Sequence, residues 1–121
     1  MKYLCLAYGD PEKMQALSKG AFEELVAQCR AYDEKLHASG HFVSGQSLGW
    51  ASASIRPRGG KPVVTDGPFA ETREQVGGLV VIECRDRDEA VRVASLHPAA
   101  HLGEHLGWGI EVHSIEDGCH P

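Results

Sequence analysis

The chain has no long apolar run and no excess of basic residues. None of its segments approaches the ~20 apolar residues that a membrane-spanning helix needs. Lys and Arg together number 12 against 17 Asp and Glu, and the formal net charge is −5. A nucleic acid held through its phosphates requires a basic face, so this composition argues against such a partner. We therefore expect a cytoplasmic protein that binds neither a membrane nor a nucleic acid.

Several catalytic and cofactor signatures are also missing. The four cysteines are far apart and form no Cys-x-x-Cys pair, and Cys5 and Cys84 lie in apolar patterns typical of small buried side chains. No serine lies in a Gly-x-Ser-x-Gly sequence, and the glycine pairs lack the spacing of a phosphate-binding loop. These absences argue against an elbow nucleophile and a bound nucleotide. We expect no cofactor.

What the chain does contain is a pattern of apolar segments that predicts one α+β domain over residues 1–121. A chain of this length can bury one core. Gly49 and Trp50 predict a turn that joins two of the strands, 42–48 and 52–58, into a hairpin. The predicted helices run from the N-cap Ser18 to about Ser39 and from Asp86 through Leu96, and the predicted strands are 3–8, 42–48, 52–58, 62–65, 79–84 and 110–115.

The order of these elements predicts a ferredoxin-like fold, in which a four-stranded, largely antiparallel sheet carries two helices on one face. The second face of such a sheet has no cover within one chain. The 79–84 strand is apolar on both faces, so the uncovered face would expose apolar side chains to water. Two sheets that pack together bury these side chains, and we therefore expect a homodimer.

The segment from Asp66 to Gln75 is the most informative motif. Gly67 has wide backbone freedom and Pro68 fixes its own φ, so the turn between them aims the Asp66 carboxylate in one direction. Asp66 is then either a site group at a strand end or only a turn residue that bonds its own backbone. Glu71, in the same loop, is a candidate second carboxylate, and two carboxylates that converge raise the pKa of one of them.

The sequence DGPFAETREQ and the following GGLVVIEC resemble the signature of the DGPF branch of the YCII-related proteins. The resemblance extends upstream to 53–56 and downstream to 109–112. It implies a dimeric α+β barrel with a pocket that contains an acidic residue. The wider group is associated with a His–Asp pair whose histidine lies on the first helix. This chain has Gln28, Cys29 and Arg30 in that stretch, so the imidazole is expected from elsewhere.

His97, His101 and His105 follow one another at intervals of four residues, which places them near one face of a helix. Three interpretations remain open. The row can hold a metal, it can line a pocket with imidazoles suited to proton transfer, or His97 can cap the turn that follows. Pro98 and Gly103 interrupt a rigid ligand helix, so we expect no metal and favour proton transfer by His97 or His101.

Two functions are consistent with these features. In the first, a pocket binds an unidentified small molecule and performs acid–base chemistry, with Asp66, His97 and His101 as catalytic groups. Arg56, Glu71 and Trp50 would then contact the substrate. In the second, the protein is a non-catalytic ligand-sensing or regulatory module. The resemblance suggests an extracytoplasmic-function sigma factor as the partner of such a module.

Overall fold

The computed structural model describes residues 1–69 and 72–118. Four strands form one sheet in the order β2-β5-β1-β6, and every neighbouring pair in it is antiparallel. This is the ferredoxin-like order, so the predicted four-stranded α+β sheet is confirmed. The strands are β1 (Lys2–Gly9), β2 (Phe42–Ser47), β5 (Gln75–Glu83) and β6 (Gly109–Ser114).

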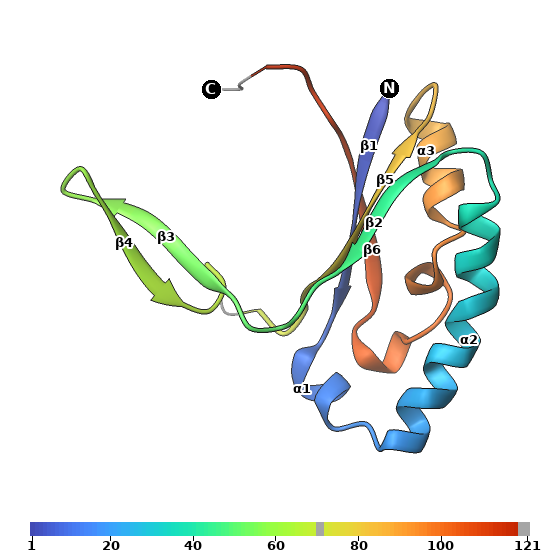
Figure 1. Ribbon diagram of the computed structural model, residues 1–121, viewed down its shortest axis with the longest axis horizontal. Coiled ribbons are helices and arrows are strands. Elements are labelled where there is room, and N and C mark those ends of the chain that lie inside the picture. The colour runs from blue at the N-terminus through green and yellow to red at the C-terminus, as the bar shows by residue number, and fades with distance from the viewer. Residues whose placement is uncertain (70–71, 119–121) are drawn as a thin grey trace.

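Two helices, α2 (Lys19–His37) and α3 (Arg87–Ala94), cover one face of this sheet, as predicted (Figure 1). Ser18 caps α2 by accepting the Ala21 amide at 3.1 Å, and Asp86 caps α3 by accepting the Glu89 amide at 2.9 Å. Within the described ranges, no helix is both long and apolar enough to cross a membrane. The remaining short helices are α1 (Pro11–Gln15), η1 (Pro98–Ala100) and η2 (Glu104–Leu106).

The core lies between the sheet and these two helices. Alternate residues of β1 and β5 point toward the helices, because successive side chains of a strand face opposite sides. Ile82 at the centre of this layer is fully buried, and Leu36 of α2 is 2% exposed. The other buried members of the core are Tyr3, Cys5, Val80, Cys84, Ala90, Val93 and Ala94.

The described residues leave the other face of the sheet without a covering helix. Its side chains belong to the alternate positions of β1 and β5, and the register places Leu4 beside Val81 and Leu6 beside Leu79. With Tyr8 these residues are only half-buried, and we call them the open face. At its β6 edge, Glu111 accepts the Tyr8 hydroxyl at 3.0 Å and bonds His113 at 2.7 Å. The open face is therefore apolar at its centre and polar at one rim.

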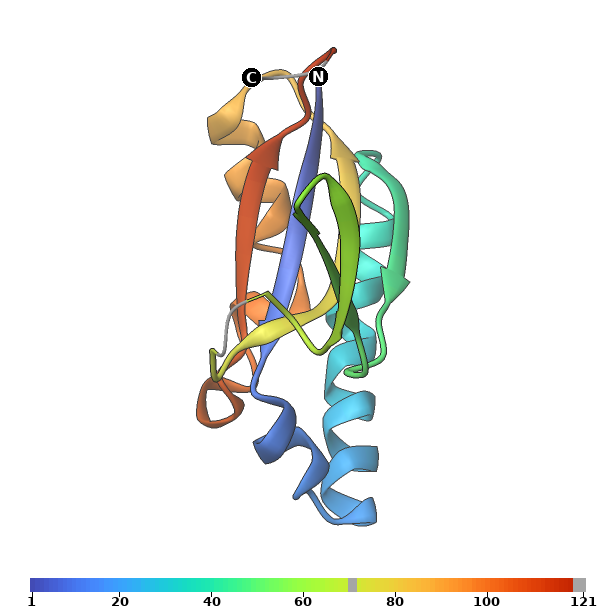
Figure 2. The same cartoon turned by 90° about the vertical axis from the view of Figure 1, so that its left-hand side faces the viewer.

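The predicted hairpin between residues 42–48 and 52–58 is wrong. The strand β2 pairs with β5, and β3 (Ala53–Arg58) pairs instead with β4 (Lys61–Asp66) in a separate two-stranded sheet. Gly59 and Gly60 explain this pairing, because both have positive φ and form the tight turn that a two-residue hairpin requires. This hairpin, which we call the arm, projects from the side of the sheet opposite the helices (Figures 1 and 2).

Candidate functional site

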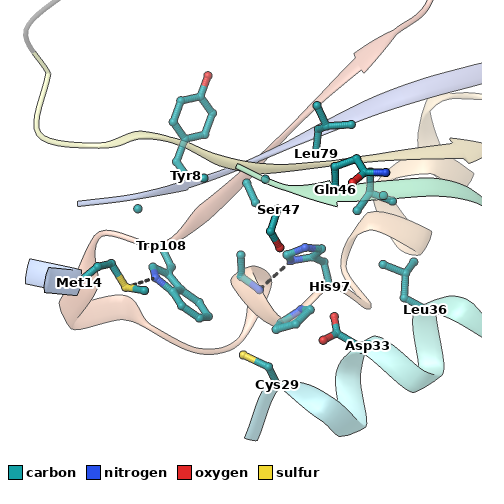
Figure 3. Close-up of a pocket in the computed structure, with 18 of the residues that line it drawn as sticks. Tyr8, Met14, Cys29, Asp33, Leu36, Gln46, Ser47, Leu79, His97 and Trp108 are labelled. Carbon is teal, nitrogen blue, oxygen red and sulfur yellow. Dashed lines mark hydrogen bonds between the residues drawn. The ribbon is translucent and has the colours of Figure 1, made fainter. Parts of the chain in front are cut away.

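A cavity of about 400 Å³ lies between the helix-covered face of the sheet, α2 and η1 (Figure 3). Most of its wall is apolar, and a few polar side chains converge on it, which is the usual character of a small-molecule site. The polar groups include Asp33 and His37 from α2, Gln46 and Ser47 from β2, and His97 from the start of η1. The apolar wall includes Ala7, Met14, Leu36, Phe42, Val80, Pro98 and Ala99.

Two indole rings line the same cavity. Trp50 is half-buried, and it packs so closely on Gly77 that a Cβ at that position would lie 2.6 Å from the ring. Trp108 donates its ring N–H to the sulfur of Met14 at 3.2 Å. Both rings also lie beside Gly9, where a Cβ would come within 3.4 Å of each. The glycines therefore make room for two flat aromatic walls, and the structure places Trp50 where a ligand could contact it.

His97 is held in one protonation form by its own backbone. Its Nδ1 accepts the amide N–H of Ala99 at 2.9 Å (Figure 3). A neutral imidazole has one N–H, so the proton must lie on Nε2. Protonation of Nδ1 would place one N–H against another. Burial lowers the pKa of His97, and the charge of Asp33 only partly opposes this effect. His97 is therefore a neutral ring with one hydrogen-bond donor left for the cavity.

Asp33 is the acidic residue that the structure places beside His97, and sequence analysis missed it. Figure 3 shows both side chains at neighbouring parts of the cavity wall. The missed signal was its position one helical turn after Cys29 and three residues before Leu36, on the face of α2 that otherwise carries apolar residues. A half-buried carboxylate that faces a cavity is a candidate site group.

His97, His101 and His105 do not lie on one common face. His97 lines the cavity and caps η1, whereas His101 is exposed, bonds the Ser95 carbonyl through Nε2 at 2.5 Å and stacks on Tyr32 at 4.9 Å. His105 is also exposed. Two separate 3-10 turns replace the single helix that would have aligned the rings, as Pro98 and Gly103 indicated. His101 does not line the cavity of its own chain, and its catalytic role stays a prediction.

None of the described residues of the Asp66 motif lines the cavity. Asp66 ends β4 on the arm with an exposed side chain, which agrees better with a turn residue than with a site group at a strand end. Arg56 is exposed on the facing strand, and its guanidinium lies 4.5 Å from the centre of the Phe69 ring. Glu71 lies outside the described residues. Asp66 does not line the cavity that holds His97, and its pairing with His97 or His101 stays a prediction.

A second cluster of potential ligands lies at the other end of the sheet. His41, Cys84 and Glu89 have ligand atoms within 4.8 Å of one another. Each is already engaged: the His41 Nδ1 bonds the Glu83 carbonyl at 2.8 Å, and Arg85 donates to Glu89 at 2.8 Å. Burial also raises the pKa of the Cys84 thiol, which disfavours the thiolate that binds metal. We assign this cluster to the anchoring of α3 on the sheet.

Replacement of His97 by Asn is expected to reduce the loss of stability at acidic pH. Asn keeps an acceptor for the Ala99 amide but does not titrate. Because the pKa of His97 in the folded chain lies below its ordinary value of 6.5, the unfolded chain binds its proton first as the pH falls. The free energy of unfolding then decreases as the pH falls through 6.5 toward the folded pKa.

Urea unfolding at pH 7.5 and pH 5.0 measures this difference for both proteins. The wild type should lose more stability between the two pH values than His97→Asn does, since all other titrating groups are shared. An equal or larger loss in the variant would contradict the lowered pKa.

Three comparisons place this chain among known proteins. The model of the YCII-related domain matches residues 1–106. An uncharacterized protein of Rhizobium meliloti, R00369, is 35% identical over 96 residues, which is 78% of this chain and 77% of that protein.

A similar solved structure is 5-chloro-2-hydroxyhydroquinone dehydrochlorinase (TftG) from Burkholderia phenoliruptrix, in complex with 2,5-dihydroxybenzoquinone. It is 16% identical, with a TM-score of 0.51 over 98% of this chain and 96% of that one. At this identity the likeness concerns the fold alone. The match to the family model and the relative in Rhizobium meliloti show more: the chain belongs to the YCII-related family.

Proposed function

We propose that this protein is a homodimeric, cofactor-independent enzyme that performs acid–base chemistry on a small oxygenated ring compound. The observation that carries the proposal is the pair of His97 and Asp33 at one cavity, with the His97 ring fixed as a neutral donor. The Asp66–Phe69 motif supports placement in the DGPF branch of the family. The apolar open face supports the homodimer, and the composition supports a cytoplasmic location.

In the proposed reaction, Asp33 is the base and His97 the stabilising donor. The Asp33 carboxylate accepts a proton from a C–H or O–H group of the substrate. The negative charge that develops on the neighbouring oxygen of the substrate then accepts a hydrogen bond from the His97 Nε2–H. The proton on Asp33 returns to another atom of the product or to water, so the enzyme ends each cycle unchanged.

The shape of the cavity supports a flat substrate. Its volume of about 400 Å³ lies in the range of small-molecule sites, roughly 300–1,000 Å³. The indoles of Trp50 and Trp108 offer flat apolar walls. The structurally similar dehydrochlorinase binds a dihydroxylated quinone, which has this shape and carries oxygens on its ring. We therefore propose hydroxylated quinones and phenols as the substrate class.

Asp66, Arg56, Glu71 and His101 remain proposed site residues of lower rank. Asp66, Arg56 and His101 do not line the cavity of their own chain, so they would act only on a molecule or cavity that another copy brings to them. The rival function is a non-catalytic module that senses a ligand and associates with an extracytoplasmic-function sigma factor. The exposed Asp66 side chain favours it, because a carboxylate on a projecting arm is available to a protein partner.

A panel of hydroxylated quinones, catechols and chlorinated hydroquinones tests the proposal against its rival. Calorimetry measures binding, and mass spectrometry of the incubated compounds measures conversion. Binding together with conversion of at least one compound supports the enzyme. Binding without any conversion favours the sensing module. If no compound binds, the proposed substrate class is wrong.

A further inference from the structure

The arm has one apolar face that the described part of its own chain leaves exposed. Partners across the hairpin share a face, and so do alternate residues of each strand. The register pairs Ile55 with Val64 and Pro57 with Pro62, so these four residues share one face of the arm, which we call its apolar face, and Ala53 and Asp66 end the same face at the base of the arm. The opposite face carries Val63 among polar and charged residues, namely Ser54, Arg56, Arg58, Lys61 and Thr65.

The exposure of these residues is unusual for apolar side chains. Val64 is 64% exposed and Ile55 is 59% exposed. Every residue of the arm except Ser54 is exposed. A hairpin of two strands is at best marginally stable in water without a further surface to pack on. The arm therefore requires a partner surface for its apolar face.

We propose that the apolar face of the arm packs on the body of a second copy of this chain, so that the two copies of the dimer exchange arms. This inference rests on the homodimer in the proposed function. Figure 2 looks onto the open face with the arm projecting toward the viewer. A second copy that covers the open face must therefore meet the arm. In a two-fold dimer each arm then reaches the body of the other copy.

Charge also favours a second copy as the partner. The arm carries three basic residues, Arg56, Arg58 and Lys61, and one acidic residue, Asp66, whereas the whole chain has a formal net charge of −5. A basic arm and an acidic body attract each other when they belong to two copies of the same protein. The three basic residues lie on the face opposite Ile55 and Val64, so this attraction acts over a distance while the apolar face makes the contact.

The arm is expected to dock by this face rather than by its edges. Proline has no backbone N–H and cannot donate to an added strand. Pro57 and Pro62 lie opposite each other in the two strands, so each edge of the arm lacks a donor close to the turn. Addition of a further strand is thereby disfavoured, and burial of Ile55 and Val64 becomes the source of affinity.

Two neighbouring valines provide a matched test. Val64→Ser removes an apolar group from the apolar face, and Val63→Ser makes the same change on the other face. Sedimentation equilibrium over a range of concentrations gives the dimer Kd of each. We expect Val64→Ser to raise the Kd by about tenfold or more, equivalent to about 1.4 kcal/mol, and Val63→Ser to change it by less than about twofold. Circular dichroism confirms that both variants fold.

A photo-crosslinker locates the arm directly. In Ile55→p-benzoyl-phenylalanine, irradiation should yield a covalent dimer, and peptide mapping should join residue 55 to the body of the other copy. A wild-type dimer with equal Kd values for both valine variants and no such crosslink would overturn the arm exchange but leave the homodimer intact. A wild type that stays monomeric at the highest attainable concentration would overturn both, and would favour a different protein as the partner of the arm.

Discussion

Replacement of Asp33 by Asn is expected to lower the turnover number by about 10²- to 10⁴-fold, the usual contribution of a positioned general base. Asn has nearly the same shape and can still line the cavity, but its amide does not accept a proton from the substrate. The affinity for a bound compound should change much less than the turnover. Steady-state kinetics on a compound that the wild type converts, with calorimetry for binding, separates the two effects.

Asp66→Asn is the matched control for this prediction. It makes the same chemical change at the carboxylate that the sequence motif favoured, which lies on the arm and outside the cavity wall. If the arm only contributes to dimerisation, turnover per dimer should remain within a few-fold of the wild type. A large loss in Asp66→Asn together with an unchanged Asp33→Asn would reverse the assignment of the base.

Replacement of Ile82 by Ala should lower the free energy of unfolding by about 2–5 kcal/mol, the range for a large-to-small change in a well-packed core. The side chain of Ile82 is fully buried near the C-terminal end of β5, between Tyr3 of β1 and Phe42 of β2. The loss of three carbons leaves a cavity that the sheet and helices can close only in part. Urea unfolding at one fixed protein concentration measures the effect, because dimerisation adds to the apparent stability.

Val91→Ala provides the control for this second prediction. Val91 lies on α3 and is 41% exposed, and Ala has the higher helix propensity. The free energy of unfolding of Val91→Ala should therefore stay within about 0.5 kcal/mol of the wild-type value. If Ile82→Ala cost no more than Val91→Ala, the core would not lie where the structure places it.

The main sheet and its two long helices follow directly from local sequence signals. The apolar runs of β1 and β5, the cap Ser18 and the pair of Asp86 and Glu89 each determine a nearby backbone conformation. The pairing of β3 was not predictable in the same way. Gly49 and Gly59-Gly60 both indicate turns, so β3 could pair with β2 or with β4. Its partner depends on which strand pairs with β5 in the main sheet. The pairing of β3 is therefore decided by contacts between residues that are far apart in the sequence.

The candidate site could likewise be predicted only in part from the sequence. The histidine at position 97 could be proposed from the sequence because proton transfer depends on residue type. Its partner could not, since Asp33 and His97 are brought together by the packing of α2 beside η1. The Asp66 motif indicates a pocket because a rigid turn fixes the direction of a side chain. That direction depends on the arm, which leaves the sheet at residue 48.

NMR of the ring nitrogens shows whether His97 is a neutral donor that faces a bound ligand. In protein labelled with ¹⁵N-histidine at pH 7, we expect a His97 ring with the proton on Nε2 and a bare Nδ1. Addition of 2,5-dihydroxybenzoquinone should shift the Nε2–H resonance downfield as a hydrogen bond to the ligand forms. An imidazolium, a proton on Nδ1, or an Nε2–H signal that stays unchanged while the compound binds would contradict this role of His97.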